Sequence, residues 1–326
     1  MSSEHPAINL TAQTDISVHG SRLDQAIAIL FPEYSRSKLK TWILQGAVSV
    51  NGKVCITPKH KLLGFERIEI HAVVEVQVEH EAQSIALDVV FEDDDILVIN
   101  KPSDLVVHPG AGNPKGTILN ALLDRVPDIN KVPRAGIVHR LDKDTTGLMV
   151  VAKTLIAQTH LVEQLQSRTM SREYEAIVTG SLVAGGIVDA AIGRHPTKRT
   201  HMAVREAGKP AITHYRVMKK FRSHTHLRLK LESGRTHQIR VHMAHIKHPI
   251  VGDQAYGGRP RIPKNMSQEC LQQLRSFRRQ ALHAAQLSLY HPVSEEWLSW
   301  QAPLPVDIKG LLADLSQDTL VHGLDD

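Results

Sequence analysis

The sequence predicts a chain of two domains that mix helices with strands, and three observations support this. The length of 326 residues suggests about two domains of roughly 150 residues. Helical patterns and a hairpin signal open the chain, and the longer remainder alternates strand-like and helical runs. The composition changes between them, because residues 71–100 hold eight acidic residues and no Lys or Arg. We expect a flexible terminus at 1–16, a small domain at 17–77, a linker at 78–86, a larger domain at 87–310 and an acidic tail at 311–326.

The small domain is expected to contain two short helices followed by a hairpin. Apolar residues recur at helical spacing over 23–30, and a second helix begins after Ser35, a residue type that caps helix N-termini. The alternating run 48–56 is interrupted by Asn51-Gly52. This dipeptide favours a type I′ turn, because both central positions of that turn need φ > 0.

The larger domain is expected to alternate strands and helices without an internal repeat. Its strand-like runs are short: those at 89–91, 96–99 and 147–152 are apolar, and the run 227–231 alternates apolar and basic residues. Its helical patterns lie around 117–124, 156–167 and 236–247. Residues 314–326 are acidic, and we expect them to be frayed.

Composition excludes several classes of protein. Apolar residues make up 42% of the chain, which excludes wholesale disorder. The only cysteines, Cys55 and Cys270, lie far apart and outside any CxxC motif, which argues against a disulfide scaffold or a thiolate zinc site. No apolar run reaches the length of a membrane span, and the first residues lack the pattern of a signal peptide. We therefore expect a soluble cytoplasmic protein that does not bind membranes.

The distribution of charge points to a polyanion. The chain has 39 Lys and Arg against 34 Asp and Glu, for a formal charge of +5, but residues 194–240 alone hold 13 Lys or Arg against two acids. The second predicted helix adds Arg36, Lys38 and Lys40 on the side opposite its apolar residues. Concentrated basic blocks are typical of nucleic-acid binding, although a solvated basic face is the alternative.

Two stretches of the sequence suggest a ligand site but depart from the pattern that such a site requires. Residues 108–117 are rich in glycine but place Lys115 before Gly116 and Thr117, in an order that is not that of a phosphate-binding loop. No nucleotide cofactor is therefore expected. His242, His245 and His248, with Asp253 downstream, suggest a metal site, but three ligands at this spacing rotate around a helix and converge poorly. No metal is expected either.

Two polar clusters follow strand-like runs and could carry chemistry. The first is His139-Arg-Leu-Asp-Lys-Asp-Thr-Thr146, which lies between two apolar runs where a reactive side chain can be held rigidly. From the pattern alone, Asp142 or Asp144 could be reactive or could cap a turn. The second is Ser233-Gly-Arg-Thr-His-Gln-Ile-Arg-Val-His242, whose arginines could bind phosphate, form an ion pair or belong to an N-capped basic helix.

These clusters resemble the signature motifs of the pseudouridine synthases that act on ribosomal RNA. The matching stretches occur in the family's order: Asn100-Lys-Pro102, His139-Arg-Leu-Asp-Lys-Asp-Thr-Thr-Gly-Leu148, Arg172-Glu-Tyr-Glu-Ala176 and Gly234-Arg-Thr-His-Gln-Ile-Arg240. Residues 17–77 are similar to the S4-type RNA-binding domain, and the resemblance as a whole covers roughly 17–310. Thr146 departs from the family, since many members have Ser there, and the acidic tail is not characteristic.

The resemblance implies the fold and the catalytic residues. The fold would be α+β, with a catalytic domain around a mixed, largely antiparallel sheet and a small α+β module before it. The activity would be isomerisation of uridine to pseudouridine in 23S ribosomal RNA. Asp142 would be the nucleophile or base, Arg240 would hold its charge, and Tyr174 would stack on the displaced uracil.

The resemblance also implies how RNA binds. A target base must be flipped out of its stack, and Arg140 would occupy the vacated space. Further RNA contacts are expected from His139, Lys101, Arg235, Arg36, Lys38 and Lys40. The partner would be 23S rRNA or a precursor of the 50S particle, the enzyme would be a monomer, and it would need no cofactor. Two alternatives are a non-catalytic RNA-binding assembly factor and a metal-dependent hydrolase that uses the His242 region.

Overall fold

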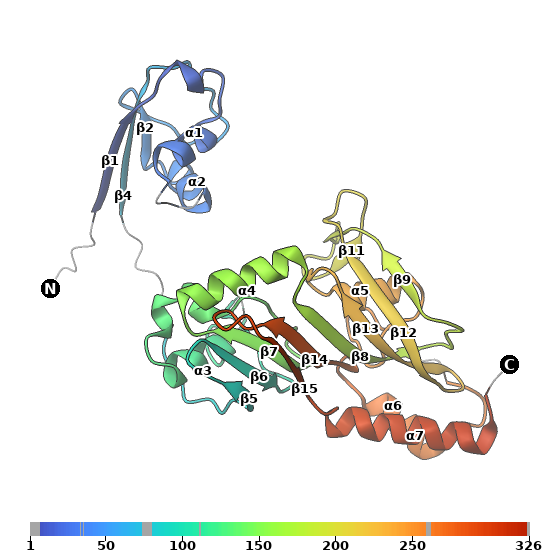
Figure 1. Ribbon diagram of the computed structural model, residues 1–326. Coiled ribbons are helices and arrows are strands. Elements are labelled where there is room, and N and C mark those ends of the chain that lie inside the picture. Colours follow the sequence, from blue (N-terminus) through green and yellow to red (C-terminus); the bar gives the residue numbers. More distant parts are fainter. Residues whose placement is uncertain are drawn as a thin grey trace. The chain divides into compact units, whose positions relative to one another are not determined.

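The computed structural model describes residues 7–32, 34, 36–73, 80–110, 112–258 and 262–324. The chain divides into two compact units, Met1–Glu79 and His80–Asp326 (Figure 1). The first residues of the predicted linker 78–86 lie outside the described part of the chain, as does the predicted helix cap Ser35. No helix in the described part is long and apolar enough to cross a membrane.

The amino-terminal unit is a four-stranded antiparallel sheet with two helices against it. Its strands follow the order β1-β4-β2-β3. The elements are β1 (Ala7–Gln13), a short 3-10 helix (Ile16–Val18), α1 (Leu23–Leu30), α2 (Arg36–Leu44), β2 (Val48–Val50), β3 (Lys53–Val54) and β4 (Arg67–Val73). The predicted hairpin is confirmed, because Asn51 and Gly52 both have positive φ, 51° and 74°, and join β2 to β3.

The loose terminus predicted for 1–16 is wrong over β1. This strand pairs antiparallel with β4 along its whole length. Ile8, Leu10 and Ala12 alternate with polar residues and pack against the core of the unit. The strand was missed because its partner lies about 60 residues further along the chain, and local sequence carries no signal of that pairing.

The carboxy-terminal unit is built on a nine-stranded sheet, and the predicted α+β class with a mixed, largely antiparallel sheet is confirmed. The order is β5-β6-β7-β14-β8-β13-β12-β9, with β15 beside β14, and the one parallel pair along this order is β7 with β14. The strands are β5 (Val89–Glu92), β6 (Ile96–Lys101), β7 (Thr146–Ala152), β8 (Ser171–Thr179), β9 (Gly186–Asp189), β12 (Ile212–Lys220), β13 (His224–Leu231), β14 (Leu282–Tyr290) and β15 (Trp297–Gln301). A separate hairpin joins β10 (Ile192–Arg194) to β11 (Met202–Val204).

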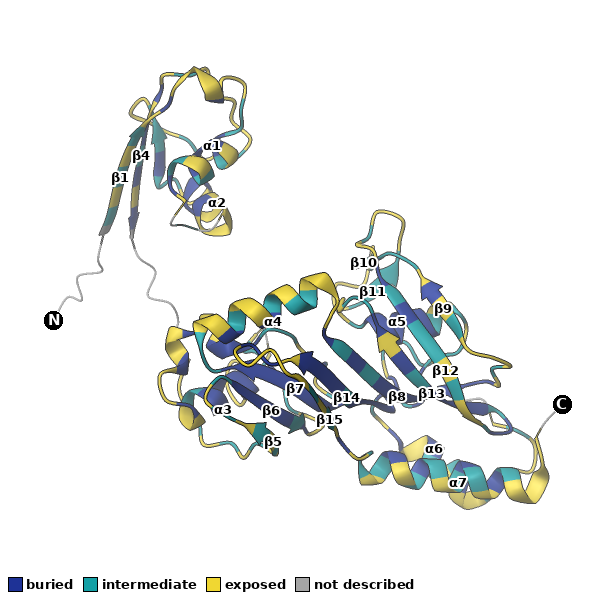
Figure 2. Cartoon of the chain, in the orientation of Figure 1, coloured by how far each residue is buried: buried dark blue, intermediate teal, exposed yellow. Residues whose placement is uncertain are grey.

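Five α-helices are described in the carboxy-terminal unit, around its sheet. They are α3 (Ile118–Arg125), α4 (Leu155–Ser167), α5 (Gln238–His245), α6 (Gln268–Ser276) and α7 (Val306–His322), with 3-10 turns at Ile129–Lys131 and Pro133–Gly136. Every residue of β7 is buried, whereas α4 and α7 expose one face to solvent (Figure 2). The central strands therefore give rigid support to the loops at their ends.

The acidic, frayed end predicted for 311–326 is wrong over most of its length. Residues 311–322 form the second part of α7, and Leu311 and Leu315 are buried in the main core. Asp318 is also buried and forms an ion pair with Arg222 at 3.4 Å. The acidic composition concealed a helix whose buried residues Ile308, Leu311 and Leu315 recur at helical spacing on one face.

Candidate active site

A pocket of about 590 Å³ opens on the carboxy-terminal unit at the ends of its central strands. Three chain segments that are far apart in the sequence line it: the loop 134–145 before β7, the strand β8, and residues 231–240 at the start of α5. The end of α4 closes a further side. Both polar clusters singled out in the sequence therefore meet at one place.

Asp142 lies in this pocket on a turn that the surrounding core holds in place. The neighbouring Leu141 is buried. The backbone carbonyl oxygen of Asp142 accepts a hydrogen bond from the backbone N–H of Thr145 at 3.1 Å. The Asp142 side chain is 17% exposed, and its Oδ2 accepts a hydrogen bond from Nη1 of Arg240 at 2.9 Å. The structure thus brings together Asp142 and Arg240, which lie 98 residues apart in the sequence.

Arg240 is held by a second carboxylate. Its Nε and Nη2 donate to the two oxygens of Asp253 at 2.7 and 2.9 Å, a bidentate pair that fixes the plane of the guanidinium. The backbone N–H groups of Ala255 and Tyr256 donate to Asp253 as well, at 2.9 and 3.0 Å. Only Nη1 of Arg240 is left to face Asp142, so Asp253 sets the direction from which the Asp142 carboxylate is held.

The pKa values of this pair follow from burial and from the contact itself. Burial alone would lower the pKa of Arg240, but the hydrogen bond to Asp253 and the charges of Asp142 and Asp253 raise it. Burial would likewise raise the pKa of Asp253, but the Arg240 guanidinium holds it below its usual range. Both groups therefore stay ionised in the buried floor of the pocket.

Tyr174 lines the same pocket from β8. Its side chain is buried, and on the sheet it pairs with Leu229 of β13 and Ala284 of β14. Burial raises the pKa of its hydroxyl, so the ring is a neutral phenol at physiological pH. The three residues expected to be catalytic, Asp142, Tyr174 and Arg240, therefore line one cavity.

Lys101 does not fit its predicted contact with RNA. Its side chain is only 1% exposed, and its Nζ donates to the carbonyl oxygens of Pro102, Leu105 and Lys143 at 2.8 to 2.9 Å. These three bonds use all the donors of an ammonium group. Burial lowers the pKa of Lys101 to about 8, while the nearby Asp144 and Asp142 oppose that shift. Lys101 thus ties the loop that carries Asp142 to the end of β6.

His139 also differs from its predicted role as an RNA contact. Its Nε2 accepts a hydrogen bond from the backbone N–H of Val150 on β7, at 3.1 Å. Burial, with a smaller contribution from Arg172, lowers the pKa of His139 to about 3. It is therefore a neutral ring that anchors the loop to β7 and offers no positive charge to a phosphate.

The remaining predicted RNA contacts are exposed. Arg140 and Arg235 lie at the pocket, with Arg134 nearby, and Arg235 donates from Nε to the carbonyl oxygen of Pro210 at 3.2 Å. In the amino-terminal unit, all three basic residues of α2 are exposed.

Several residues of the site were missed from the sequence. His237 has a left-handed backbone, with φ at 57°, and its Nε2 lies 3.9 Å from Oδ1 of Asp142. Its Nδ1 lies 2.8 Å from the hydroxyl of Tyr256, which accepts a hydrogen bond from the backbone N–H of Met202. The Tyr256 hydroxyl can then donate to Nδ1, which assigns the proton of His237 to the nitrogen that faces Asp142.

Two of the three histidines that suggested a metal, His242 and His248, form other contacts. The ring nitrogens of His242 lie 2.8 Å from the Thr213 hydroxyl and 2.9 Å from the Ala190 carbonyl oxygen. Nδ1 of His248 faces the carbonyl oxygen of Thr179 at 3.0 Å. In the described residues these histidines therefore do not form a common ligand set.

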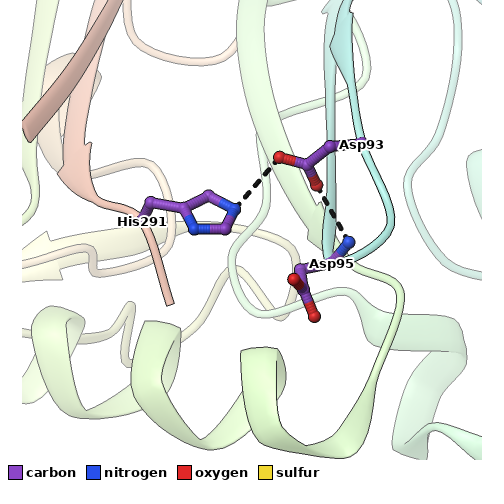
Figure 3. A group of neighbouring side chains, drawn as sticks. All are labelled: Asp93, Asp95 and His291. Carbon is purple, nitrogen blue, oxygen red and sulfur yellow. Dashed lines mark hydrogen bonds and ion pairs between the residues drawn. The ribbon is translucent and has the colours of Figure 1, made fainter. Parts of the chain in front are cut away.

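Among the described residues, three possible metal ligands converge at Asp93, Asp95 and His291 (Figure 3). Nε2 of His291 lies 3.0 Å from Oδ2 of Asp93, and its Nδ1 accepts from the backbone N–H groups of Val293 and Ser294. Asp93 in turn accepts from the backbone of Asp95. These hydrogen bonds already explain the cluster as the link between two turns.

Comparisons with known protein families agree with this arrangement. A family model described as RNA pseudouridylate synthase matches residues 95–245, and one described as S4 domain matches residues 21–68. The first match contains the two polar clusters and the strand between them.

Curated relatives match over almost the whole chain. The ribosomal large subunit pseudouridine synthase D of Salmonella typhimurium is 63% identical over 97% of this chain and 97% of its own length. The proteins of the same name from Escherichia coli K12 and Haemophilus influenzae are 61% and 60% identical over 97% of this chain.

Solved structures show the same fold at lower identity. The human RNA pseudouridylate synthase domain containing 4 aligns with a TM-score of 0.55 at 27% identity, over 70% of this chain and 93% of its own. The human RNA pseudouridylate synthase domain containing 1 aligns with a TM-score of 0.54 at 26% identity, over 76% and 99% of the two chains.

Proposed function

Because the chain belongs to the RNA pseudouridylate synthase family, we propose that it isomerises uridine to pseudouridine in the RNA of the large ribosomal subunit. The names of its curated relatives support this substrate. The target is a uridine of 23S rRNA, in a stem-loop that faces the small subunit, and the modification contributes to ribosome assembly. The enzyme acts in the cytoplasm as a monomer, without a cofactor or a nucleotide.

The reaction is an isomerisation that needs one well-placed carboxylate. The C1′–N1 bond of uridine breaks, the base turns, and a C1′–C5 bond forms; the proton on C5 leaves and N1 takes up a proton, so the atoms balance. Asp142 supplies the carboxylate, as nucleophile or base near C1′ or C6. The observation that carries this proposal is the contact of 2.9 Å between Asp142 and Arg240 inside a pocket of about 590 Å³. That volume is within the range of about 300–1,000 Å³ for small-molecule sites.

The other residues of the pocket receive the flipped base. The neutral ring of Tyr174 stacks on the displaced uracil, which keeps it in place while it turns. Arg140, two residues before Asp142 and exposed, occupies the space that the base leaves and contacts phosphate. Once the base fills the pocket, water is excluded from the reacting atoms and hydrolysis does not compete.

The amino-terminal unit supplies affinity. Arg36, Lys38 and Lys40 are exposed on α2, and the ammonium group of Lys38 lies 5.5 and 5.3 Å from the ring centres of Tyr34 and Trp42. Basic groups on one helix neutralise phosphates, so binding weakens as salt displaces these contacts.

The test is release of tritium from RNA labelled at C5 of uridine, with the wild type and Asp142→Asn compared. Asn keeps an oxygen that Arg240 can reach, so the variant is expected to fold and to bind RNA with unchanged affinity. Its rate of release should fall by about 10³-fold or more. Pseudouridines mapped in ribosomal RNA from a deletion strain would identify the target.

Two results would argue for other functions. A wild-type protein that binds RNA but releases no tritium would support the non-catalytic assembly factor. Loss of activity on treatment with a chelator would support a metal-dependent reaction. Equal release by Asp142→Asn and wild type would remove Asp142 from the mechanism.

A further inference from the structure

Arg172 is a buried arginine in the pocket that none of the interactions described above explains. It lies on β8, two residues before Tyr174, and its backbone pairs with Leu287 of β14. Its residue surface is 7% exposed, and it lines the pocket together with Asp142. Side chains two apart on a strand point to the same face, so Arg172 and Tyr174 approach the pocket side by side.

Its guanidinium has no acceptor among the described residues. The Nε of Arg172 is fully buried without a hydrogen-bond partner, and no ion pair joins Arg172 to a carboxylate in the described part of the chain. The other large buried cations differ: Arg240 binds two carboxylates and Lys101 binds three carbonyl oxygens. A buried charge without a partner is costly, so its persistence points to an acceptor that arrives with the substrate.

The chain makes room for this guanidinium. A Cβ atom built on Gly234 would lie 2.8 Å from Nη1 of Arg172, closer than real contacts allow. The glycine therefore lets Arg172 lie against the loop that leads into α5. Any side chain at position 234 would have to displace the guanidinium from the wall of the pocket.

The charges of the pocket indicate which atoms Arg172 meets. Arg240 is shared between Asp142 and Asp253, so its charge is already committed to the carboxylates. Among the residues that the structure describes, Arg172 is the cation of the pocket interior that no carboxylate or carbonyl oxygen binds. The exposed arginines at positions 140 and 235 are open to the phosphates of the RNA, whereas the group that enters the interior is the flipped nucleoside.

We propose that Arg172 donates to a carbonyl oxygen of the flipped uracil and stabilises the negative charge of the base while it is detached. This deepens the proposed function and rests on it. When the C1′–N1 bond breaks, its electron pair stays on the uracil and spreads over N1 and the ring carbonyl oxygens. The guanidinium faces that charge in a site with little water, where such contacts are strong. It keeps all its protons, because a guanidinium does not deprotonate in proteins. The charge disappears when C5 joins C1′ and loses its proton and N1 takes one up.

The experiment is a double-mutant cycle between Arg172 and the oxygens of the base. Wild type and Arg172→Met would be compared under single-turnover conditions on a fragment that contains the mapped target, tritiated at C5, as uridine, 2-thiouridine or 4-thiouridine. Arg172→Met should lower the rate on uridine by about 10²–10³-fold, the range for losing one charge-stabilising donor, with less than threefold change in RNA affinity. One of the two thio substitutions should slow the wild type but not Arg172→Met. Equal effects of both substitutions on the two proteins would overturn the proposal.

Two further measurements separate this role from others. Because Arg172 has no hydrogen-bond or ion-pair partner among the described residues, Arg172→Met should unfold at the same temperature as the wild type or higher, and a clear drop would indicate a structural role instead. Arg235→Met serves as the control for loss of a phosphate contact. This substitution should weaken RNA binding and reduce the salt dependence of binding. The same pattern in Arg172→Met would assign Arg172 to phosphate and overturn the proposal. Absence of release by wild type on uridine would instead refute the proposed function.

Discussion

The floor of the pocket and its rim use arginine in opposite ways. On the floor, Arg240 is 8% exposed and its guanidinium is shared between Asp142 and Asp253. On the rim, Arg140 and Arg235 are exposed, and the one contact described above is from Arg235 to a backbone carbonyl oxygen. From this difference we expect substitutions of the floor arginine to change the geometry and charge of the site, and substitutions of the rim arginines to change only the affinity for RNA.

The largest effect that would test this contrast is expected from Arg240→Met. The substitution leaves Asp142 and Asp253 without their cation in a buried site, and breaking such a pair typically costs about 3–5 kcal/mol. We expect a lower free energy of unfolding in denaturant titrations and a rate of tritium release below about 1% of wild type. The matched control is Arg235→Met, which should change stability by no more than about 0.5 kcal/mol. Similar losses of stability in both variants would contradict the distinction between floor and rim.

Lys101→Met should have the next largest effect, through position rather than contact. The change leaves three carbonyl oxygens without their donor, at about 1–3 kcal/mol for an unsatisfied buried group, and releases the loop that carries Asp142. We expect kcat to fall about tenfold or more with little change in KM. Lys143→Met is the control, since Lys143 belongs to the same loop but is exposed and pairs with Asp104 at the surface. If Lys101→Met changed KM alone, the result would support the original prediction that Lys101 contacts RNA.

The sequence predicts the features that a short motif carries. It does not predict contacts between residues that only the folded chain brings together. Asp142 and Arg240 were singled out by their motifs, and the hairpin by Asn51-Gly52. The sequence indicates Asp253 only as a possible metal ligand, because its spacing from Arg240 does not reveal the turn that brings the two side chains together.

The errors have a common physical cause. Lys101 and His139 stand in polar motifs, where the family resemblance predicts that they contact RNA. Whether such a residue faces solvent depends on which carbonyl or N–H groups of distant segments surround it, and local sequence does not specify these. In the same way, β1 depends on a strand that lies far along the chain.

Rim substitutions should give smaller effects that appear in binding. Arg140→Gln and Arg235→Gln each remove one exposed cation that we propose contacts the RNA. Each should raise KM several-fold at moderate salt and reduce the slope of log affinity against log salt by about 0.7–0.9. Stability should not change. Stopped-flow or filter-binding titrations at several salt concentrations would measure the slope. A fall in kcat at unchanged KM would show that the residue acts in the chemical step and not in RNA binding.

The basic residues of α2 in the amino-terminal unit are exposed, as the rim arginines are. We therefore expect them to affect RNA binding and not the chemical step. Arg36→Gln with Lys40→Gln on α2 should weaken binding to ribosomal RNA and lower its salt dependence, with kcat at saturating RNA unchanged. The loss should be greater on long RNA than on a short fragment at high concentration. An equal loss on both substrates would show that α2 does not add a separate contact.

The smallest expected effect is the contribution of His139 to the pH dependence of the free energy of unfolding. The pKa of His139 is about 3 in the folded protein, because burial lowers it, and about 6.5 when the chain is unfolded. Between these values the unfolded chain binds a proton that the folded protein does not, so stability falls as pH drops below about 6.5. At pH 5.5 we expect His139 to contribute a loss of about 1 kcal/mol relative to pH 7.5. Unfolding titrations at the two pH values would measure it in wild type, in His139→Gln, which keeps an acceptor for Val150, and in the exposed control His245→Gln. Only His139→Gln should show a reduced pH dependence, because this substitution removes the histidine whose pKa burial lowers in the folded protein.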